Sequence, residues 1–179
     1  MSIINLITHQ QSEVSKKKFM KNLKKNNQII NGIWFYGLSG SGKTTSAKYL
    51  KKYIFKNALI LDGDQIRKYI SVDLGFKMED RVKQLQRIVG LCKICVNSKI
   101  FPICSTVYMN KKAIIELKKQ KIIAIKIERD FNKIKKTKIY KYKKNVVGID
   151  LHYEKNFKHL ILKNVIKKNL FKDLKNIFL

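Results

Sequence analysis

The chain has 179 residues, 45% of them hydrophobic, which suits one domain with a substantial buried core. No apolar run approaches the roughly 18 residues of a membrane span, and Met1 to Gln11 lack the regions of a signal peptide, so we expect a cytoplasmic protein without a membrane partner. The net charge of +28 attracts polyanions, but lysines spread over the whole chain carry it and arginines are scarce, so nucleic acid is not the partner that we expect.

The three cysteines, Cys92, Cys95 and Cys104, are too few and too clustered for a disulfide framework. Cys92 and Cys95 have the spacing of metal ligands, but they fall in a helical pattern and no second pair follows, so zinc is not expected. We interpret all three as reduced thiols of a cytosolic protein.

The chain divides into two parts by composition. Residues 1–30 are polar and basic, which indicates an N-terminal extension, and residues 31–179 alternate between apolar runs and helical periods. They predict strands over 33–37, 58–61, 100–106, 122–127 and 160–162, and helices over 47–54, 65–70, 79–98, 111–119 and 166–177. The last helix has its apolar face at Ile166, Leu170, Leu174 and Ile177. This alternation predicts an α/β fold, a parallel sheet of about five strands with helices on both faces.

A glycine-rich turn follows the first predicted strand. The pattern Gly-x-x-x-x-Gly-Lys-Thr is met by Gly37, Gly42, Lys43 and Thr44. In this pattern backbone N–H groups wrap phosphates, Lys43 reaches the β- and γ-phosphates, and the Thr44 hydroxyl ligates Mg²⁺. We therefore predict binding of ATP and Mg²⁺ by a P-loop that consists of Gly37, Leu38, Ser39, Gly40, Ser41, Gly42, Lys43, Thr44 and Thr45.

Two carboxylates follow the second predicted strand, in Asp62-Gly-Asp64. Open α/β sheets bind ligands at the edge where the carboxyl ends of the strands lie, and two acids at that edge can have different roles. One can support the metal, and the other can accept a proton from an attacking hydroxyl. A simpler interpretation of Asp64 is an N-cap of the helix at 65–70.

Arginine and an aromatic residue come next along the chain. Arg67 and Arg81 are better candidates for a phosphate clamp than any lysine, because a guanidinium binds anions through two parallel hydrogen bonds. Phe76 is either an exposed ring that stacks on a base or a core residue. Residues 130–148 are rich in lysine and hold few apolar anchors, so they predict a lid over an anionic ligand, with a solvated loop as the alternative.

Together these segments resemble adenylylsulfate (APS) kinases over about residues 30–165. The resemblance is carried by residues 34–45, Leu61 to Asp64 with Arg67, Asp73 to Phe76, Glu79 to Arg81, Arg87, and residues 147–150. It implies a three-layer P-loop kinase fold, and transfer of the ATP γ-phosphoryl group to the 3′-hydroxyl of APS, a small anionic nucleotide acceptor. It also implies a lid that closes over ATP, and a homodimer.

The resemblance gives each site residue a role. Lys43 and Asp64 are the predicted catalytic residues, with Asp64 as the base or orienting carboxylate. Arg67 and Arg81 would hold the anionic end of the acceptor, and Phe76 would stack on its base. We assign Asp62, together with Thr44, to the metal.

Three positions depart from the family pattern, and we count all three among the predicted acceptor-binding residues. Gln84 replaces an asparagine, Thr106 replaces a serine, and Val146 aligns with the aromatic residue that would face Phe76 across the adenine. Loss of half of this sandwich weakens purine stacking by about 1–3 kcal/mol per base. The Asn-Val-Val-Gly form at 145–148 resembles members found among surface-polysaccharide enzymes, so a CDP-linked acceptor, as in cytidine diphosphoramidate kinase, is an alternative.

A function of another class also accounts for the charge. A nucleotide-binding regulatory or nucleic-acid-associated module would use the +28 charge directly. It predicts salt-sensitive binding to RNA or DNA and little loss on Asp64→Ala. A kinase predicts near-abolished turnover for Asp64→Ala, with the affinity for ATP largely kept.

Overall fold

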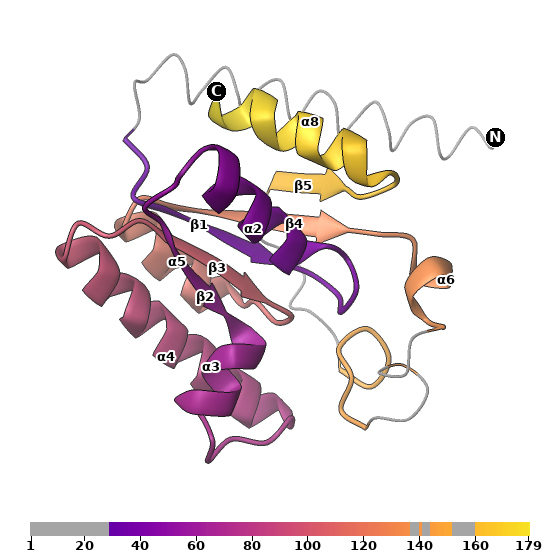
Figure 1. The fold of residues 1–179 in the computed structure, drawn as a ribbon. Coiled ribbons are helices and arrows are strands. Elements are labelled where there is room, and N and C mark those ends of the chain that lie inside the picture. The colour runs from indigo at the N-terminus through magenta and orange to yellow at the C-terminus, as the bar shows by residue number, and fades with distance from the viewer. Residues whose placement is uncertain (1–28, 137–139, 141–143, 152–159) are drawn as a thin grey trace.

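The computed structural model describes residues 29–136, 140, 144–151 and 160–179 (Figure 1). The predicted N-terminal extension at 1–30 falls almost wholly outside these residues and stays a prediction. The extent of the predicted lid at 130–148 also stays a prediction, because 137–139 and 141–143 lie outside the described part.

One parallel sheet forms the centre of the domain, with its strands in the order β2-β3-β1-β4-β5 (Figure 1). The central strand β1 is hydrogen-bonded to β3 on one side and to β4 on the other, and all five of its residues are buried. Because the strands are parallel, the turns after them meet at one edge of the sheet. The strands are β1 (Gly32–Tyr36), β2 (Leu59–Asp62), β3 (Pro102–Thr106), β4 (Ile122–Glu128) and β5 (Leu160–Lys163).

Helices connect the strands and cover both faces of the sheet. The predicted α/β architecture, a parallel sheet of five strands between two helical layers, is thereby confirmed. The helices are α2 (Lys43–Tyr53), α3 (Gly63–Tyr69), α4 (Met78–Asn97), α5 (Lys111–Lys119), α6 (Phe131–Ile134) and α8 (Lys167–Phe178).

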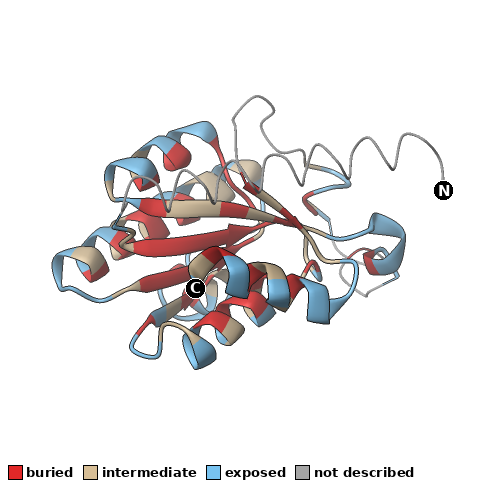
Figure 2. Cartoon of the chain, turned by 90° about the horizontal axis from the view of Figure 1, so that it is seen from above, coloured by how far each residue is buried: buried red, intermediate tan, exposed pale blue. Residues whose placement is uncertain are grey.

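The two faces of β1 belong to two separate hydrophobic cores. Ile33 and Phe35 pack with residues of α2 and α8, whereas Trp34 and Tyr36 pack with residues of α3, α4 and α5. Side chains alternate across a strand, so an unbroken apolar run is expected where both faces are covered. Figure 2 shows the result, with buried residues along the strands and exposed residues on the outer sides of the helices.

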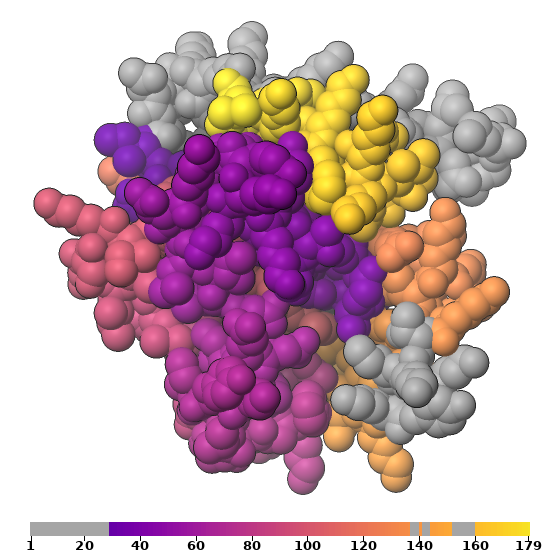
Figure 3. Space-filling model, in the orientation of Figure 1, coloured from indigo at the N-terminus to yellow at the C-terminus, as the bar shows by residue number. Residues whose placement is uncertain are grey.

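Helices α2 and α8 lie side by side over one face of the sheet, and their side chains meet in Figure 3. The rings of Tyr49 in α2 and Phe171 in α8 stack with their centroids 4.1 Å apart. The C-terminal helix therefore packs on the helix that follows the P-loop, and it contributes to the core behind that loop.

The predicted apolar face of the closing helix is confirmed at Leu170, Leu174 and Ile177, which are all buried. The prediction for Ile166 is wrong. This residue is the extended N-cap of α8, and its side chain is 58% exposed. Ile166 and Leu170 are four residues apart, which is also the spacing of two residues on one face of a helix, so the sequence pattern does not distinguish an apolar N-cap from a buried helical residue.

Thiols lie within the core between α4 and β3. Cys92 and Cys104 are fully buried, with their sulfur atoms 3.2 Å apart, and burial raises the pKa of the Cys104 thiol well above its usual value. Within the described residues, no helix combines the length and the apolar character needed to cross a membrane.

We expect the packing of α8 to contribute measurably to stability. Leu174→Ala removes a fully buried side chain and should lower the free energy of unfolding by about 2–5 kcal/mol. Lys175→Ala, its exposed neighbour on the same helix, should change it by less than about 0.5 kcal/mol. Urea unfolding measures both values, and equal stability of the two variants would contradict the described position of α8.

Candidate active site

A cavity of about 870 Å³ opens at the edge of the sheet where the strands end. This volume lies in the range of small-molecule pockets. Its walls come from the ends of all five strands and the turns after them: the P-loop after β1, Asp62 and Asp64 at and after the end of β2, residues 105–108 at and after the end of β3, Arg129 after β4, and Asn164 after β5.

The P-loop makes a tight turn between β1 and α2. Gly37 has a φ of +145°, and a Cβ on it would lie 2.3 Å from the carbonyl oxygen of Ile127, so a side chain does not fit there. Helix α2 begins at Lys43, and the N–H groups of its first turn have no acceptor within the helix. The N-cap is Gly42, which has no side chain that could accept a hydrogen bond from these N–H groups. They are therefore available to bind an anion.

Lys43 is buried at the start of α2. Its Nζ donates to the carbonyl oxygen of Leu38 at 2.8 Å, so the ammonium lies against the loop. Burial lowers the pKa of Lys43 to about 8, although the nearby carboxylates of Asp64 and Asp62 act to raise it. A bound phosphate would favour the charged form and raise this pKa again.

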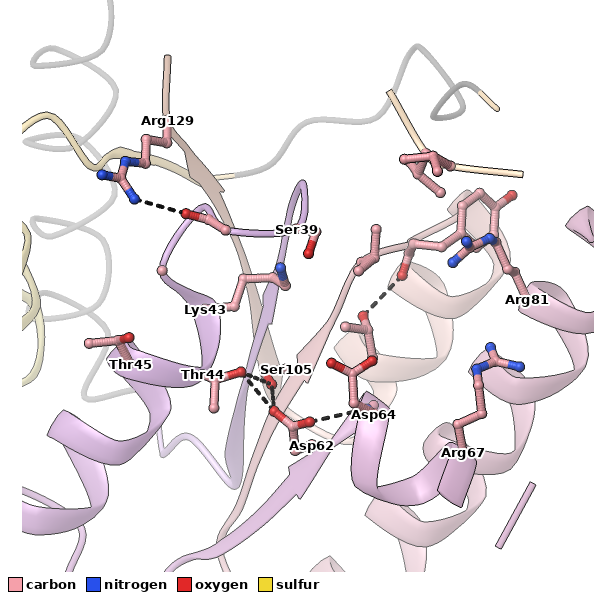
Figure 4. A pocket seen from close by; sticks show the side chains of 18 of the residues that line it. Ser39, Lys43, Thr44, Thr45, Asp62, Asp64, Arg67, Arg81, Ser105 and Arg129 are labelled. Atoms are coloured by element: carbon pink, nitrogen blue, oxygen red, sulfur yellow. Dashed lines mark hydrogen bonds between the residues drawn. The ribbon is translucent and has the colours of Figure 1, made fainter. Parts of the chain in front are cut away.

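Asp62 joins the ends of two strands to two helices (Figure 4). Its Oδ2 accepts hydrogen bonds from Ser105 Oγ at 2.6 Å and Thr44 Oγ1 at 2.8 Å, and its Oδ1 accepts from the Asp64 N–H at 3.0 Å. Burial alone would raise the pKa of Asp62, but the hydrogen bonds from Ser105, from Thr44 and from the backbone together lower it. The Asp62 carboxylate is therefore ionised at neutral pH.

The donor set of Thr44 and Asp62 fits Mg²⁺, which prefers hard oxygen ligands and takes one or two protein groups together with phosphate oxygens and water. The two oxygen atoms are 2.8 Å apart, and the carboxylate is ionised. The structure thus brings the two predicted metal residues together, and their binding of Mg²⁺ stays a prediction.

Asp64 is not an N-cap, so the simpler interpretation of this residue is wrong. Helix α3 begins at Gly63, and the cap is Asp62, whose side chain accepts from the Asp64 N–H. The Asp64 carboxylate makes no capping bond and is exposed in the cavity that Lys43 also lines. In Figure 4 it lies between the P-loop on one side and two arginines, Arg67 and Arg81, on the other.

These arginines and Phe76 form the opposite wall. Phe76 is 46% exposed, so its interpretation as a core residue is wrong. The guanidinium carbons of Arg67 and Arg81 lie 4.8 and 5.7 Å from the centroid of its ring. Arg67 donates to carbonyl oxygens of the turn before Phe76, and Arg81 donates to those of Phe76 and Asn145. The arginines therefore hold the turn that presents the ring.

Gln84 and Thr106 line the cavity, but both are buried and both bind protein groups. Gln84 Nε2 donates to the Gly63 carbonyl oxygen at 2.7 Å, at the start of α3. Thr106 Oγ1 accepts from Trp34 Nε1 at 2.8 Å and donates to the Tyr108 carbonyl oxygen at 3.0 Å. These contacts stabilise the wall of the cavity, and the acceptor-binding role of both residues stays a prediction.

The described part of the predicted lid is anchored on the P-loop by a small apolar cluster. Ile134, Tyr140 and Val146 are buried in one cluster, against which Leu38 of the P-loop packs. Ile134 ends the short helix α6, which we did not predict. These few apolar side chains thus fix the described part of the segment against the P-loop, and its role as a lid stays a prediction. Val146 also lines the cavity, and its contact with the acceptor stays a prediction.

Sequence reasoning missed four polar residues of the site. Ser105 binds Asp62, Arg129 Nη1 donates to the Gly40 carbonyl oxygen at 3.1 Å, and Asn164 Nδ2 donates to the Ser41 carbonyl oxygen at 2.7 Å. Lys144 lines the cavity. Their positions in the sequence could have indicated three of them, because Ser105, Arg129 and Asn164 lie near the ends of predicted strands, where parallel sheets bind ligands.

Comparison with known proteins assigns the family. The family model described as Adenylylsulphate kinase matches residues 30–161. The chain belongs to the adenylylsulphate kinase family. An adenylyl-sulfate kinase of Clostridium acetobutylicum is 30% identical to it over 185 residues, which cover 96% of this chain and 91% of the relative. One of Staphylococcus epidermidis is 42% identical over 101 residues, 55% of this chain and 49% of the relative, so the alignment spans about half the length of that relative.

A solved structure of the adenylylsulphate kinase family has the same fold. The Mycobacterium tuberculosis APS kinase CysC in complex with AMPPNP and APS superposes with a TM-score of 0.72 at 20% sequence identity, over 83% of this chain and 95% of that chain. The expected three-layer P-loop kinase fold is therefore confirmed.

The contacts of Thr106 predict a loss of stability when its hydroxyl is removed. Thr106→Val leaves the buried Trp34 N–H without an acceptor and should lower the free energy of unfolding by about 1–3 kcal/mol. Thr106→Ser keeps the hydroxyl and should cost less. Urea unfolding followed by the fluorescence of the single tryptophan measures both. A valine variant as stable as the unaltered protein would show that this hydrogen bond contributes nothing.

Proposed function

We propose that the protein is an ATP-dependent kinase that transfers the γ-phosphoryl group of ATP to the 3′-hydroxyl of adenylylsulfate. One observation carries the proposal: the P-loop and the wall with Arg67 and Arg81 face each other across a single cavity, which Phe76 also lines, with Asp64 between them. Membership of the adenylylsulphate kinase family supports this activity, and so do relatives named adenylyl-sulfate kinase.

On the donor side, the P-loop would bind the phosphates of ATP. The N–H groups at the start of α2 supply hydrogen bonds, and Lys43 supplies a charge at the β- and γ-phosphates. Thr44 and Asp62 would hold Mg²⁺, which when bound neutralises charge on the transferred group. Ser105 and the Asp64 N–H hold the Asp62 carboxylate in place for this role.

On the acceptor side, Phe76 would stack on the adenine, and Arg67 and Arg81 would attract the sulfate and phosphate groups. A guanidinium has five N–H donors in a planar fork, so it can bind a backbone carbonyl and an anion at the same time. Val146 would contact the base from the other wall, with less stacking area than an aromatic ring.

Asp64 would accept the proton of the acceptor hydroxyl during transfer. The 3′-oxygen forms a bond to the γ-phosphorus while the bond from that phosphorus to ADP breaks, and the proton passes to the Asp64 carboxylate. The position of Asp64 between the two walls supports this role. The products are ADP and the 3′-phosphorylated nucleotide.

The identity of the acceptor can be tested directly. The relatives named above favour APS over a CDP-linked acceptor. An assay of ADP release with APS and with a CDP-linked acceptor, each with ATP and Mg²⁺, should show turnover with APS. Turnover with neither acceptor, while ATP still binds, would contradict the kinase assignment at the acceptor step.

Substitution of Asp64 should separate chemistry from ATP binding. Asp64→Asn keeps the size and the exposed position of the side chain but removes the base, so kcat with APS should fall by about 10²–10⁴-fold. The Kd for ATP should change by less than about threefold, because the donor contacts are elsewhere. Steady-state kinetics and calorimetric titration measure the two quantities.

Asp173→Asn on α8 is the control, because it makes the same chemical change at a residue that does not line the cavity. It should leave kcat unchanged. If Asp64→Asn retained full turnover, Asp64 would not be the proton acceptor, and a nucleotide-binding module without kinase chemistry would gain support.

The lowered pKa of Lys43 predicts that ATP binding takes up a proton. At pH 8 the free site is about half protonated, and the phosphates raise the pKa, so binding should take up about 0.5 proton. Uptake should vanish near pH 6, where the free amine is already charged. Titration calorimetry in buffers of different ionisation enthalpy measures the uptake. Lys43→Arg, which stays charged, should lack this uptake at pH 8, and a variant that kept it would assign the proton to another group.

A further inference from the structure

Side chains from several parts of the chain bind the backbone carbonyl groups of the P-loop. Four successive carbonyl oxygens, those of residues 38–41, each accept a hydrogen bond from a side chain. The donor to the first is Lys43, which belongs to the motif itself. The donors to the next three lie outside the motif and are Tyr140, Arg129 and Asn164.

Two of these bonds determine the direction of N–H groups in the loop. In a trans peptide the C=O of one residue and the N–H of the next point in opposite directions. Tyr140 Oη donates to the Ser39 carbonyl oxygen at 3.0 Å and so orients the Gly40 N–H. Asn164 Nδ2 donates to the Ser41 carbonyl oxygen at 2.7 Å and so orients the Gly42 N–H.

Asn164 is well placed for this role because its own backbone is held. It follows β5 directly, and its N–H donates to the Glu128 carbonyl oxygen at 2.6 Å, at the end of the neighbouring strand. Its amide also lies close to the loop, since a Cβ on Gly42 would approach Nδ2 to 2.5 Å. The sheet thus sets the position of the donor, and the donor contacts one defined point of the P-loop.

Tyr140 reaches the loop from the other side. Its ring is buried against Leu38, Ile134 and Val146, and it meets the ring of Phe131 edge to face at 5.5 Å between centroids. This packing holds the hydroxyl at the Ser39 carbonyl oxygen. The P-loop is therefore hydrogen-bonded both to Asn164, at the end of β5, and to Tyr140, in the segment that follows α6.

We propose that Asn164 and Tyr140 are positioning residues of the P-loop, which hold its carbonyl groups outward so that the Gly40 and Gly42 N–H groups face the phosphates of ATP. The inference rests on the proposed function in that it takes ATP as the ligand. It does not depend on the identity of the acceptor or on the chemistry of transfer.

The test compares nucleotide affinity with the stability of the ligand-free protein. Asn164→Ala and Tyr140→Phe each remove one donor, and each should raise the Kd for Mg²⁺·AMPPNP about three- to tenfold. Asn164→Asp should raise it by about 30-fold or more, because a carboxylate would face both the Ser41 carbonyl and the phosphates. Titration calorimetry on the full chain gives each Kd.

Matched controls make the same changes away from the loop. Asn169→Ala and Asn169→Asp alter an exposed asparagine on α8, and Tyr53→Phe alters an exposed tyrosine on α2. Their Kd values should stay within about twofold of the unaltered protein. The melting temperature of every variant without ligand should fall by no more than about 4 °C, because one partly buried hydrogen bond contributes only about 0.5–1.5 kcal/mol to the stability of the whole fold.

The outcomes distinguish the inference from the proposed function. Weaker nucleotide binding with a melting temperature inside this limit, confined to the variants of Asn164 and Tyr140, supports the inference. Unchanged affinity overturns it, and so does a loss of affinity that only follows a lower melting temperature, since that would be a purely structural role. Failure of the unaltered protein to bind AMPPNP would instead contradict the proposed function, and the inference would fail with it.

Discussion

The carboxylate of Asp62 is the interaction on which the geometry of the site depends. Three hydrogen bonds converge on it, from the Ser105 hydroxyl, the Thr44 hydroxyl and the Asp64 N–H, and they tie β3, α2 and α3 to the end of β2. A buried charge is costly unless donors surround it, so these partners must be present for the carboxylate to stay ionised. The same bonds set Thr44 at the P-loop and place Asp64 at the first turn of α3, facing the cavity.

The positive charges around the cavity differ in residue type from those over the whole chain. The net charge of +28 comes mostly from dispersed lysines, whereas three of the four arginines, Arg67, Arg81 and Arg129, line the cavity. The fourth, Arg87, forms a bidentate ion pair with Asp73. Guanidinium groups can hold a backbone carbonyl and still present donors to an anion, which a lysine does less well. The scarcity of arginine in this sequence therefore made its positions informative, although the total charge was not.

Local patterns predicted the strands, the P-loop and the carboxylates after β2, because each depends on residues close together in the chain. The apolar run of β1 and the Gly37–Thr44 motif belong to this class. The contacts of Asn164, Tyr140 and Ser105 were not predictable, since they join positions between 43 and 123 residues apart. The sequence indicated only that strand ends share one edge. Which side chain reaches which carbonyl depends on the packing of β5 and of the segment after α6.

The two walls of the cavity are parts of one packed unit. Leu38 of the P-loop packs in the cluster with Val146 and Tyr140, and Arg81 of the opposite wall donates to the carbonyl oxygen of Asn145, the neighbour of Val146. Residues 145 and 146 therefore touch both the donor loop and the wall that presents Phe76. An aromatic side chain at 146 would have to fit between Leu38 and the cavity, whereas valine fills the cluster at 6% exposure. If the proposed acceptor binds here, the small residue at this position would offer it less stacking area, in return for close packing against the P-loop.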